Sequence, residues 1–244
     1  MSVLLRAELL KLRTTRTFVA LVGASLALSL LVVGLTSAIS DEFTEQRVRE
    51  LFTADFTGLF ITLLGVMGMA GEWRHRTITS TVLAAPDRTR LLAAKVIAYA
   101  VAGMVLSLVV TVSIMVLGTV ILSARDLPTL GGGDLADVLW RNLVVAALFG
   151  ALGVGVGGLV RNQVVAIVGV LIVGFALEPA LLAVVPDVAR YLPLIALPTS
   201  IQDVDVTFPE AGLLDPLPAL GLMLVWVAAL FAAGAAALRR RDVV

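Results

Sequence analysis

Cysteine is absent from the 244 residues of this chain, and histidine occurs once, as His75. The absence of thiols excludes disulfide bonds and cysteine chemistry, and a lone histidine without cysteine argues against a structural metal site. Charged residues make up only 15% of the chain, whereas 59% of the residues are hydrophobic. The mean hydropathy of +1.04 lies far outside the range of soluble globular proteins.

Catalytic motifs are missing as well. The chain contains no GxxxxGK[ST] phosphate-binding loop, no GxSxG and no HExxH, so nothing in it predicts ATP hydrolysis or another intrinsic activity. We therefore expect no catalytic residues, no metal ligands and no cofactor on this chain, and no nucleic-acid partner.

Six long apolar runs dominate the sequence instead. A helix needs roughly 20 mostly apolar residues to cross a bilayer, and backbone groups in lipid must bond within their own helix. We predict an all-α, single transmembrane domain over residues 1–244, without a nucleotide-binding domain. The expected spans are about 17–40, 52–71, 92–123, 140–160, 164–185 and 217–238.

Residues 1–16 precede the first span and read as an amphipathic helix. Leu5, Leu9 and Leu12 share one helical face, while the basic residues lie elsewhere, which predicts a helix at the membrane interface. The following apolar run is longer than the about 7–15 residues of a signal-peptide core, so we expect a retained first span.

Basic residues indicate the orientation. With the amino terminus in the cytoplasm, the inner segments hold thirteen arginines and lysines and the outer segments five. Basic residues concentrate on the cytoplasmic side of membrane proteins. We therefore predict that both termini are cytoplasmic.

The connection between the second and third spans, GEWRHRTITSTVLAAPDRTRLLAAK (71–95), is long, basic and interrupted. We expect a short cytoplasmic helix from Thr77 that stops before Pro86, and a new helix that starts at Asp87. The arginines are suited to an acidic partner or to anionic lipid. Glu72 either pairs with Arg76 one turn later or is an interfacial acid without a specific role.

Glu178 and Pro179 stand late in the fifth apolar run. A carboxylate in or near the hydrocarbon costs at least about 2.5 kcal/mol and is a functional candidate by default, and proline breaks or kinks a helix. We expect them to mark a gate or the translocation path, or else Glu178 simply reaches the outer interface. Residues 186–216 that follow form either a re-entrant segment or an ordinary folded outer loop.

Small residues recur in the fourth span, where Gly153 and Gly157 form a GxxxG pair. Such pairs let two helices approach closely. We expect packing within the subunit or at a dimer interface. The Gly131–Gly132–Gly133 run before this span predicts a flexible link.

Three segments together resemble the membrane subunits of ABC type-2 (type V) exporters. They are AELLKLRTTRTF (7–18), the Glu72…Arg76-Thr77…Pro86…Arg88…Lys95 pattern, and GALGVGVGGLVRNQVV (150–165). The resemblance covers essentially the whole chain. One departure is Arg76, where the family often has glycine before the threonine.

The resemblance implies a bacterial inner-membrane permease that works as a homo- or heterodimer and extrudes an amphiphilic substrate. A separate subunit would bind and hydrolyse ATP with Mg²⁺. The second-to-third-span connection would dock on that subunit as a coupling helix. The residues expected there are Glu72, Arg74, Arg76, Thr77, Pro86, Arg88 and Arg90.

Two other classes stay open on the residues alone. A secondary transporter driven by an ion gradient would show internal repeats and polar groups at the midplane; we find no convincing repeat, and Glu178 is the only such acid that the sequence suggests. A membrane scaffold or sensor would show no effect on the ATP hydrolysis of a partner.

Overall fold

The computed structural model describes residues 2–75, 77, 87–204, 212 and 214–240. Within these residues the protein is all-helical and has no strand. The helices are α1 (Ser2–Thr14), α2 (Arg16–Ile39), α3 (Glu45–Phe52), α4 (Thr57–Arg74), α6 (Arg88–Ala124), α7 (Gly132–Leu159), α8 (Gln163–Ile172), the π-helical η1 (Val173–Leu177), α9 (Glu178–Val184), α10 (Pro186–Ala189), α11 (Ala196–Gln202) and α12 (Pro216–Arg240).

Six of the described helical stretches are long and apolar enough to cross a membrane. This confirms the predicted all-α fold with six candidate spans. The second stretch combines α3 with α4, and the fifth combines α8, η1 and α9. The stretches are Arg16–Ile39, Glu45–Arg74, Arg88–Ala124, Gly132–Leu159, Gln163–Val184 and Pro216–Arg239.

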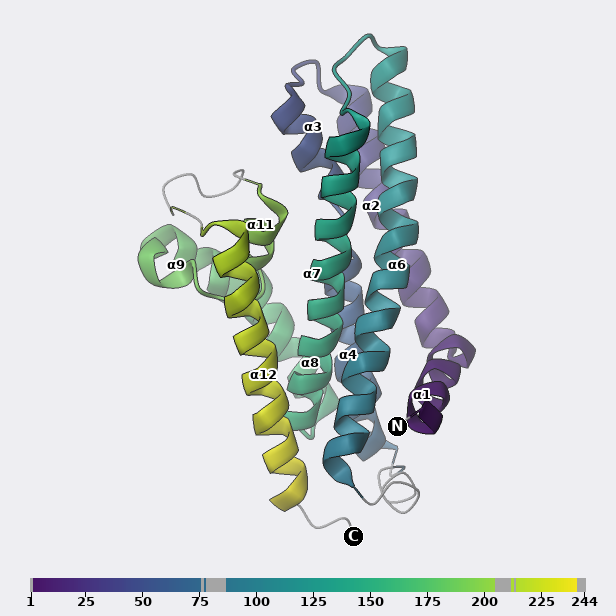
Figure 1. The fold of residues 1–244 in the computed structure, drawn as a ribbon, viewed down its shortest axis with the longest axis vertical. Helices are drawn as coiled ribbons and strands as arrows, with labels where there is room; N and C mark the ends of the chain where they lie inside the picture. Colours follow the sequence, from purple (N-terminus) through teal and green to yellow (C-terminus); the bar gives the residue numbers. More distant parts are fainter. Residues whose placement is uncertain (1, 76, 78–86, 205–211, 213, 241–244) are drawn as a thin grey trace.

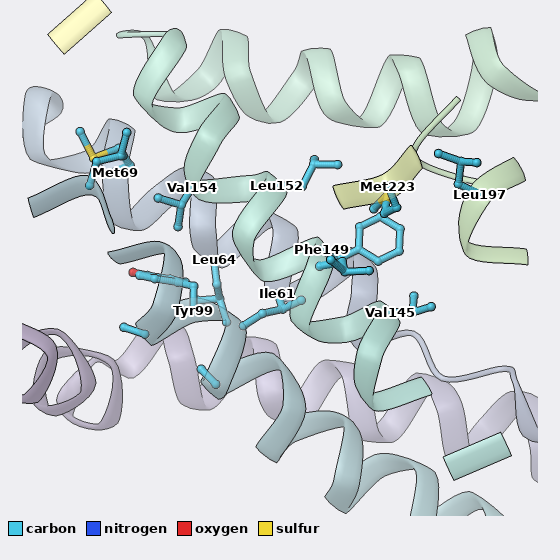
Figure 2. Packing of buried hydrophobic residues seen from close by; sticks show 14 of the residues in the cluster. Ile61, Leu64, Met69, Tyr99, Val145, Phe149, Leu152, Val154, Leu197 and Met223 are labelled. Atoms are coloured by element: carbon cyan, nitrogen blue, oxygen red, sulfur yellow. The ribbon is translucent and has the colours of Figure 1, made fainter. Parts of the chain in front are cut away.

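Helix α7 lies at the centre of the bundle, between α6 and α12 with α4 behind it (Figure 1). Its apolar window is 72% buried, against 17% for the first and fifth stretches and 22% for the last. Side chains from α4, α6, α7, α11 and α12 build the main apolar cluster around it (Figure 2). The outer helices therefore present most of their apolar surface outward.

Glycine allows this close packing. A Cβ on Gly153 would lie 2.3 Å from the Thr62 carbonyl oxygen of α4, and one on Gly157 would lie 2.8 Å from that of Val66. Real Cβ atoms do not approach backbone this closely, so α4 reaches α7 only because both positions lack a side chain. The GxxxG pair thus faces a helix of the same chain.

Two helix starts differ in how well the sequence predicted them. Helix α6 begins after Asp87, as expected, and the Asp87 carboxylate caps it by accepting from the backbone N–H groups of Thr89 and Arg90. The prediction of a flexible link at residues 131–133 was wrong. Gly131 is the N-cap of α7, and the helix already begins at Gly132, although Gly132 and Gly133 are exposed and have open space around them. The first buried residue of α7 is Val138, and helix propagation from the packed part is cooperative, so the helix extends into glycines of low propensity.

Helix α1, the start of α6 and the end of α12 lie at one end of the bundle, opposite α3 (Figure 1). This is the end that the charge distribution assigns to the cytoplasm. After α9 the chain turns through α10 into α11, which packs on α12 and α7. Leu197 and Ile201 of α11 are fully buried in the main cluster; re-entrance of this segment stays a prediction.

Candidate functional site

A buried cluster of four charged side chains joins three helices at the α1 end of the bundle. The Lys95 ammonium of α6 lies 2.8 Å from a Glu8 oxygen of α1 and 2.8 Å from Glu72 Oε1 of α4. Lys11, one turn after Glu8, lies 2.8 Å from the same Glu72 oxygen. Lys95 also donates to the Gly68 carbonyl, at 3.3 Å. We call these four side chains the charge cluster.

Three of the four side chains in the charge cluster are almost completely buried. The Lys95 side chain is 0% exposed, Glu72 3% and Glu8 9%, whereas Lys11 is 51% exposed. Charges withdrawn from water are retained only when paired and hydrogen-bonded. Two ammonium groups balance two carboxylates here, so the cluster is neutral overall.

Lys11 closes the cluster on its exposed side. Burial alone would lower the pKa of the Lys11 ammonium. Its hydrogen bond to Glu72 and the negative charges of Glu72 and Glu8 outweigh that effect and raise the pKa above its ordinary value. The lysine therefore stays charged at every physiological pH and ties α1 to α4.

Among the predicted coupling residues that the structure describes, Glu72 is the one that lies in this cluster. The expected pair with Arg76 lies outside the described residues. The ion pairs that the structure describes for Glu72 are with Lys11 and Lys95 instead. Among the described residues, no group of three or more histidine or acidic side chains is placed to hold a metal ion.

The other predicted coupling residues are spread around the same end. Arg74 and Thr77 are exposed. Arg88 donates to the Leu238 carbonyl of α12 at 2.6 Å, and Arg90 forms an exposed ion pair with Asp87 at 2.9 Å. Arg76 and Pro86 lie outside the described residues. The structure thus shows where α4 ends and α6 begins, but it does not bring together Arg74, Arg88 and Arg90, the arginines that it describes.

Sequence reasoning missed Glu8 and Lys95 as site residues. Glu8 lies on the buried stripe of α1 with Leu5, Leu9 and Leu12, and Lys95 interrupts an apolar run with Ala94 and Ala98 buried close by. A charge on an apolar stripe in each of two helices is the signal that predicts such a pair.

Glu178 has a defined structural role. Its side chain is fully buried, and its two oxygens accept from the backbone N–H groups of Leu194, Ile195 and Ala196 at 3.0, 2.6 and 2.9 Å. These are donors at the start of α11 that no helix carbonyl can satisfy. Glu178 therefore holds the turn before α11 against the end of the fifth span.

Pro179, beside it, lines an apolar cavity of about 240 Å³ between α4, α7, the fifth span and the turn before α11. Phe149, Phe175 and Ile195 form other parts of its wall. The π-helical turn η1 directly precedes Glu178; such turns are frequent at functional sites. Pro179 lines this cavity directly, whereas Glu178 holds its wall at Leu194 and Ile195 through hydrogen bonds.

A second polar network, which sequence reasoning did not single out, lies toward the other end. Asp55, between α3 and α4, accepts from Ser107 at 2.5 Å and Thr111 at 3.0 Å on α6, and from the Thr57 backbone at 2.8 Å. Asn142 of α7 donates to Thr111 at 3.1 Å. Its members satisfy one another, so the network joins α4, α6 and α7 as a structural unit.

The chain matches no known protein-family model and no curated protein sequence. The likeness to ABC type-2 permeases therefore rests on the motifs quoted above.

Proposed function

We propose that this chain is the permease subunit of an ATP-driven exporter in a bacterial cytoplasmic membrane, and that a separate ATP-binding subunit drives it. The observation that supports this most is the charge cluster, which ties α1 to both helices that flank the 75–87 connection. A partner that pulls on this connection would move α1, α4 and α6 together.

Anchors at both ends of the connection support this role. Helix α4 leads into it directly after Glu72 of the charge cluster, with His75 as its C-cap. Helix α6 leaves it through the Asp87 cap, and Arg88 bonds to α12 across the bundle. A displacement of the connection would therefore reach the last span as well as the second and third.

The substrate would be an amphiphile such as a drug, a peptide antibiotic or a lipid. The 240 Å³ cavity beside Pro179 is mainly apolar and is suited to the apolar part of such a molecule. The Glu178 bonds to residues 194–196 hold one wall of this cavity, and their rearrangement would open or close it.

A second permease copy would complete the transport path. The fifth candidate span is only 17% buried in the single chain and carries exposed Ile172, Phe175 and Leu177. Apolar surface of this kind meets lipid or another subunit.

Affinity purification in mild detergent, followed by mass spectrometry, tests the proposal. We expect a soluble chain with a phosphate-binding GxxxxGK[ST] loop to co-purify in stoichiometric amount. Its ATPase rate in proteoliposomes should fall when Arg74, Arg88 and Arg90 are changed together to glutamine, while Arg6→Gln, exposed on α1, serves as the control. Repeated purification from crosslinked membranes without an ATP-binding chain would contradict the proposal.

A further inference from the structure

A cavity of about 320 Å³ lies beside the charge cluster, between the α1–α2 junction, α4 and the start of α8. We call it the elbow cavity. Its wall includes Lys11, Glu72 and Gln163, and on the apolar side Phe18, Leu64 and Met67. It is separate from the 240 Å³ cavity at Pro179, with which it shares no lining residue.

Two oxygens in this wall have no hydrogen-bond partner among the described residues. Glu72 uses Oε1 for both lysines, and its Oε2 is buried without a partner. The side-chain oxygen of Gln163 is buried without a partner as well, and the two residues are 3% and 7% exposed. Buried acceptors left unsatisfied are costly, so a ligand with N–H donors would be stabilised by reaching these oxygens.

Lys11 offers the opposite chemistry at the same wall. Its ammonium uses one N–H for Glu72, and half of the side chain stays exposed. The remaining donors suit an anionic oxygen such as a phosphate. A ligand that fits the wall therefore combines N–H donors with an anionic group.

Charge balance narrows the ligand class. The charge cluster is already neutral, with two ammonium groups and two carboxylates. A purely cationic or purely anionic ligand would leave a net charge beside the buried Glu72 carboxylate. A zwitterionic ligand adds no net charge to the site.

The apolar side of the elbow cavity indicates where the ligand comes from. Phe18 and Leu64 belong to the first and second candidate spans, and Thr15 joins the interfacial helix to the first of them. Polar and apolar walls meet here at the level where lipid headgroups meet acyl chains. We propose that the elbow cavity binds the headgroup of phosphatidylethanolamine, with its ammonium on Glu72 and Gln163 and its phosphate on Lys11.

This inference goes beyond the proposed function and does not depend on an ATP-binding partner. The test uses the purified full chain in detergent with equal amounts of phosphatidylethanolamine, phosphatidylcholine and phosphatidylglycerol of identical acyl chains. Co-eluting lipid is quantified by mass spectrometry. Phosphatidylcholine has the same charges but no N–H donor, so we expect phosphatidylethanolamine to be enriched over it about fivefold, the effect of one net hydrogen bond.

Matched variants locate the site. Gln163→Leu removes an acceptor outside the charge cluster, and Lys11→Met removes the phosphate partner; each should reduce the enrichment to near equality without altering the elution profile. Arg6→Met, an exposed position of α1 away from the cavity, should leave it unchanged.

Three outcomes would overturn the proposal. If the unchanged protein retains phosphatidylethanolamine and phosphatidylcholine equally, it does not recognise the headgroup. Full enrichment in Gln163→Leu places the lipid elsewhere. Displacement of the lipid by an equal concentration of soluble glycerophosphoethanolamine shows that the ligand is a free headgroup and not a membrane lipid.

Discussion

Lys95 illustrates how much a single charge contributes once it is withdrawn from water. Its ammonium contacts two carboxylates and a backbone carbonyl and has no exposed surface. Removing one partner of a buried ion pair leaves the others uncompensated, which costs far more than the pair adds over an apolar substitute. Lys11 shares Glu72 with it but is half exposed, where ion pairs contribute little.

The two lysines should therefore respond differently to substitution. We expect Lys95→Met to lower the free energy of unfolding by about 3–5 kcal/mol, because Glu8 and Glu72 stay buried without their common partner. Lys11→Met should cost less than about 1 kcal/mol. Thermal unfolding in detergent, followed by tryptophan fluorescence, compares them; similar midpoints for both variants would show that Lys95 is not buried as described.

Glu178 makes a second residue-scale prediction. In Glu178→Gln one oxygen becomes an N–H₂ group that cannot accept from Leu194, so we expect faster hydrogen exchange at Leu194–Ala196 and about 1–3 kcal/mol of lost stability. Asp187→Asn, an exposed acid in α10, is the control and should change neither.

The same variant distinguishes transport mechanisms. A carboxylate engaged by three backbone donors is a structural group, so under the proposed function transport by Glu178→Gln should still depend on ATP. Loss of transport with unchanged exchange at residues 194–196 would instead favour proton coupling through Glu178.

At the scale of elements, helix length and helix spacing follow different rules. Helix α6 has 37 residues and is about 55 Å long, which exceeds the about 30 Å of hydrocarbon that a span must cross. It therefore extends into the aqueous boundary, where Arg88 and Arg90 stand. Its distance to α7, by contrast, depends on single atoms at Gly150, where a Cβ would lie 2.4 Å from a Tyr99 carbonyl.

Glycine substitution tests the spacing of α4 and α7. Gly153→Ala brings a methyl group within 2.3 Å of a backbone oxygen that cannot move without α4, and we expect a loss of about 1–3 kcal/mol. Gly169→Ala has open space around its Cβ and should be neutral or slightly stabilising, since alanine favours helix. The melting temperatures of the two variants in detergent are compared. Equal melting temperatures for Gly153→Ala and Gly169→Ala would contradict the close contact between α4 and α7.

For the whole molecule, the arrangement around α7 divides the helices into a packed centre and an outer ring. The buried shares of α2, the fifth stretch and α12 are all below a quarter. Their outward faces are apolar, as expected for helices that are surrounded by lipid. Helix α1, the start of α6 and the last turns of α12 lie at the same end of the bundle (Figure 1), and this end carries the charge cluster, Arg88 and Arg90.

We predict the orientation in the membrane from that asymmetry, and it can be measured directly because the chain has no cysteine. Arg13→Cys lies on α1 and Glu42→Cys in the α2–α3 connection, and both positions are exposed. A membrane-impermeant maleimide should label Glu42→Cys in spheroplasts and label Arg13→Cys only after lysis, because basic residues stay in the cytoplasm. The opposite labelling pattern would show that the topology is the reverse of the predicted one.

Much of the fold could be predicted from local features. Each candidate span coincides with an apolar run long enough to satisfy its own backbone, and Asp87 starts α6 through bonds to residues two and three positions later. The buried stripe of α1 follows from the spacing of Leu5, Leu9 and Leu12. These properties depend on neighbours within one or two helical turns.

The tertiary structure alone decided how the charge cluster is assembled. Glu8 and Lys95 each stand on an apolar helix face, but they are 87 residues apart, so only the packing of α1 on α6 decides that they pair. Glu178 finds its donors 16–18 residues later. Sequence determined which segments become membrane helices, since that depends on local hydrophobicity. Packing determined which charges are buried together, since that depends on which helices approach one another.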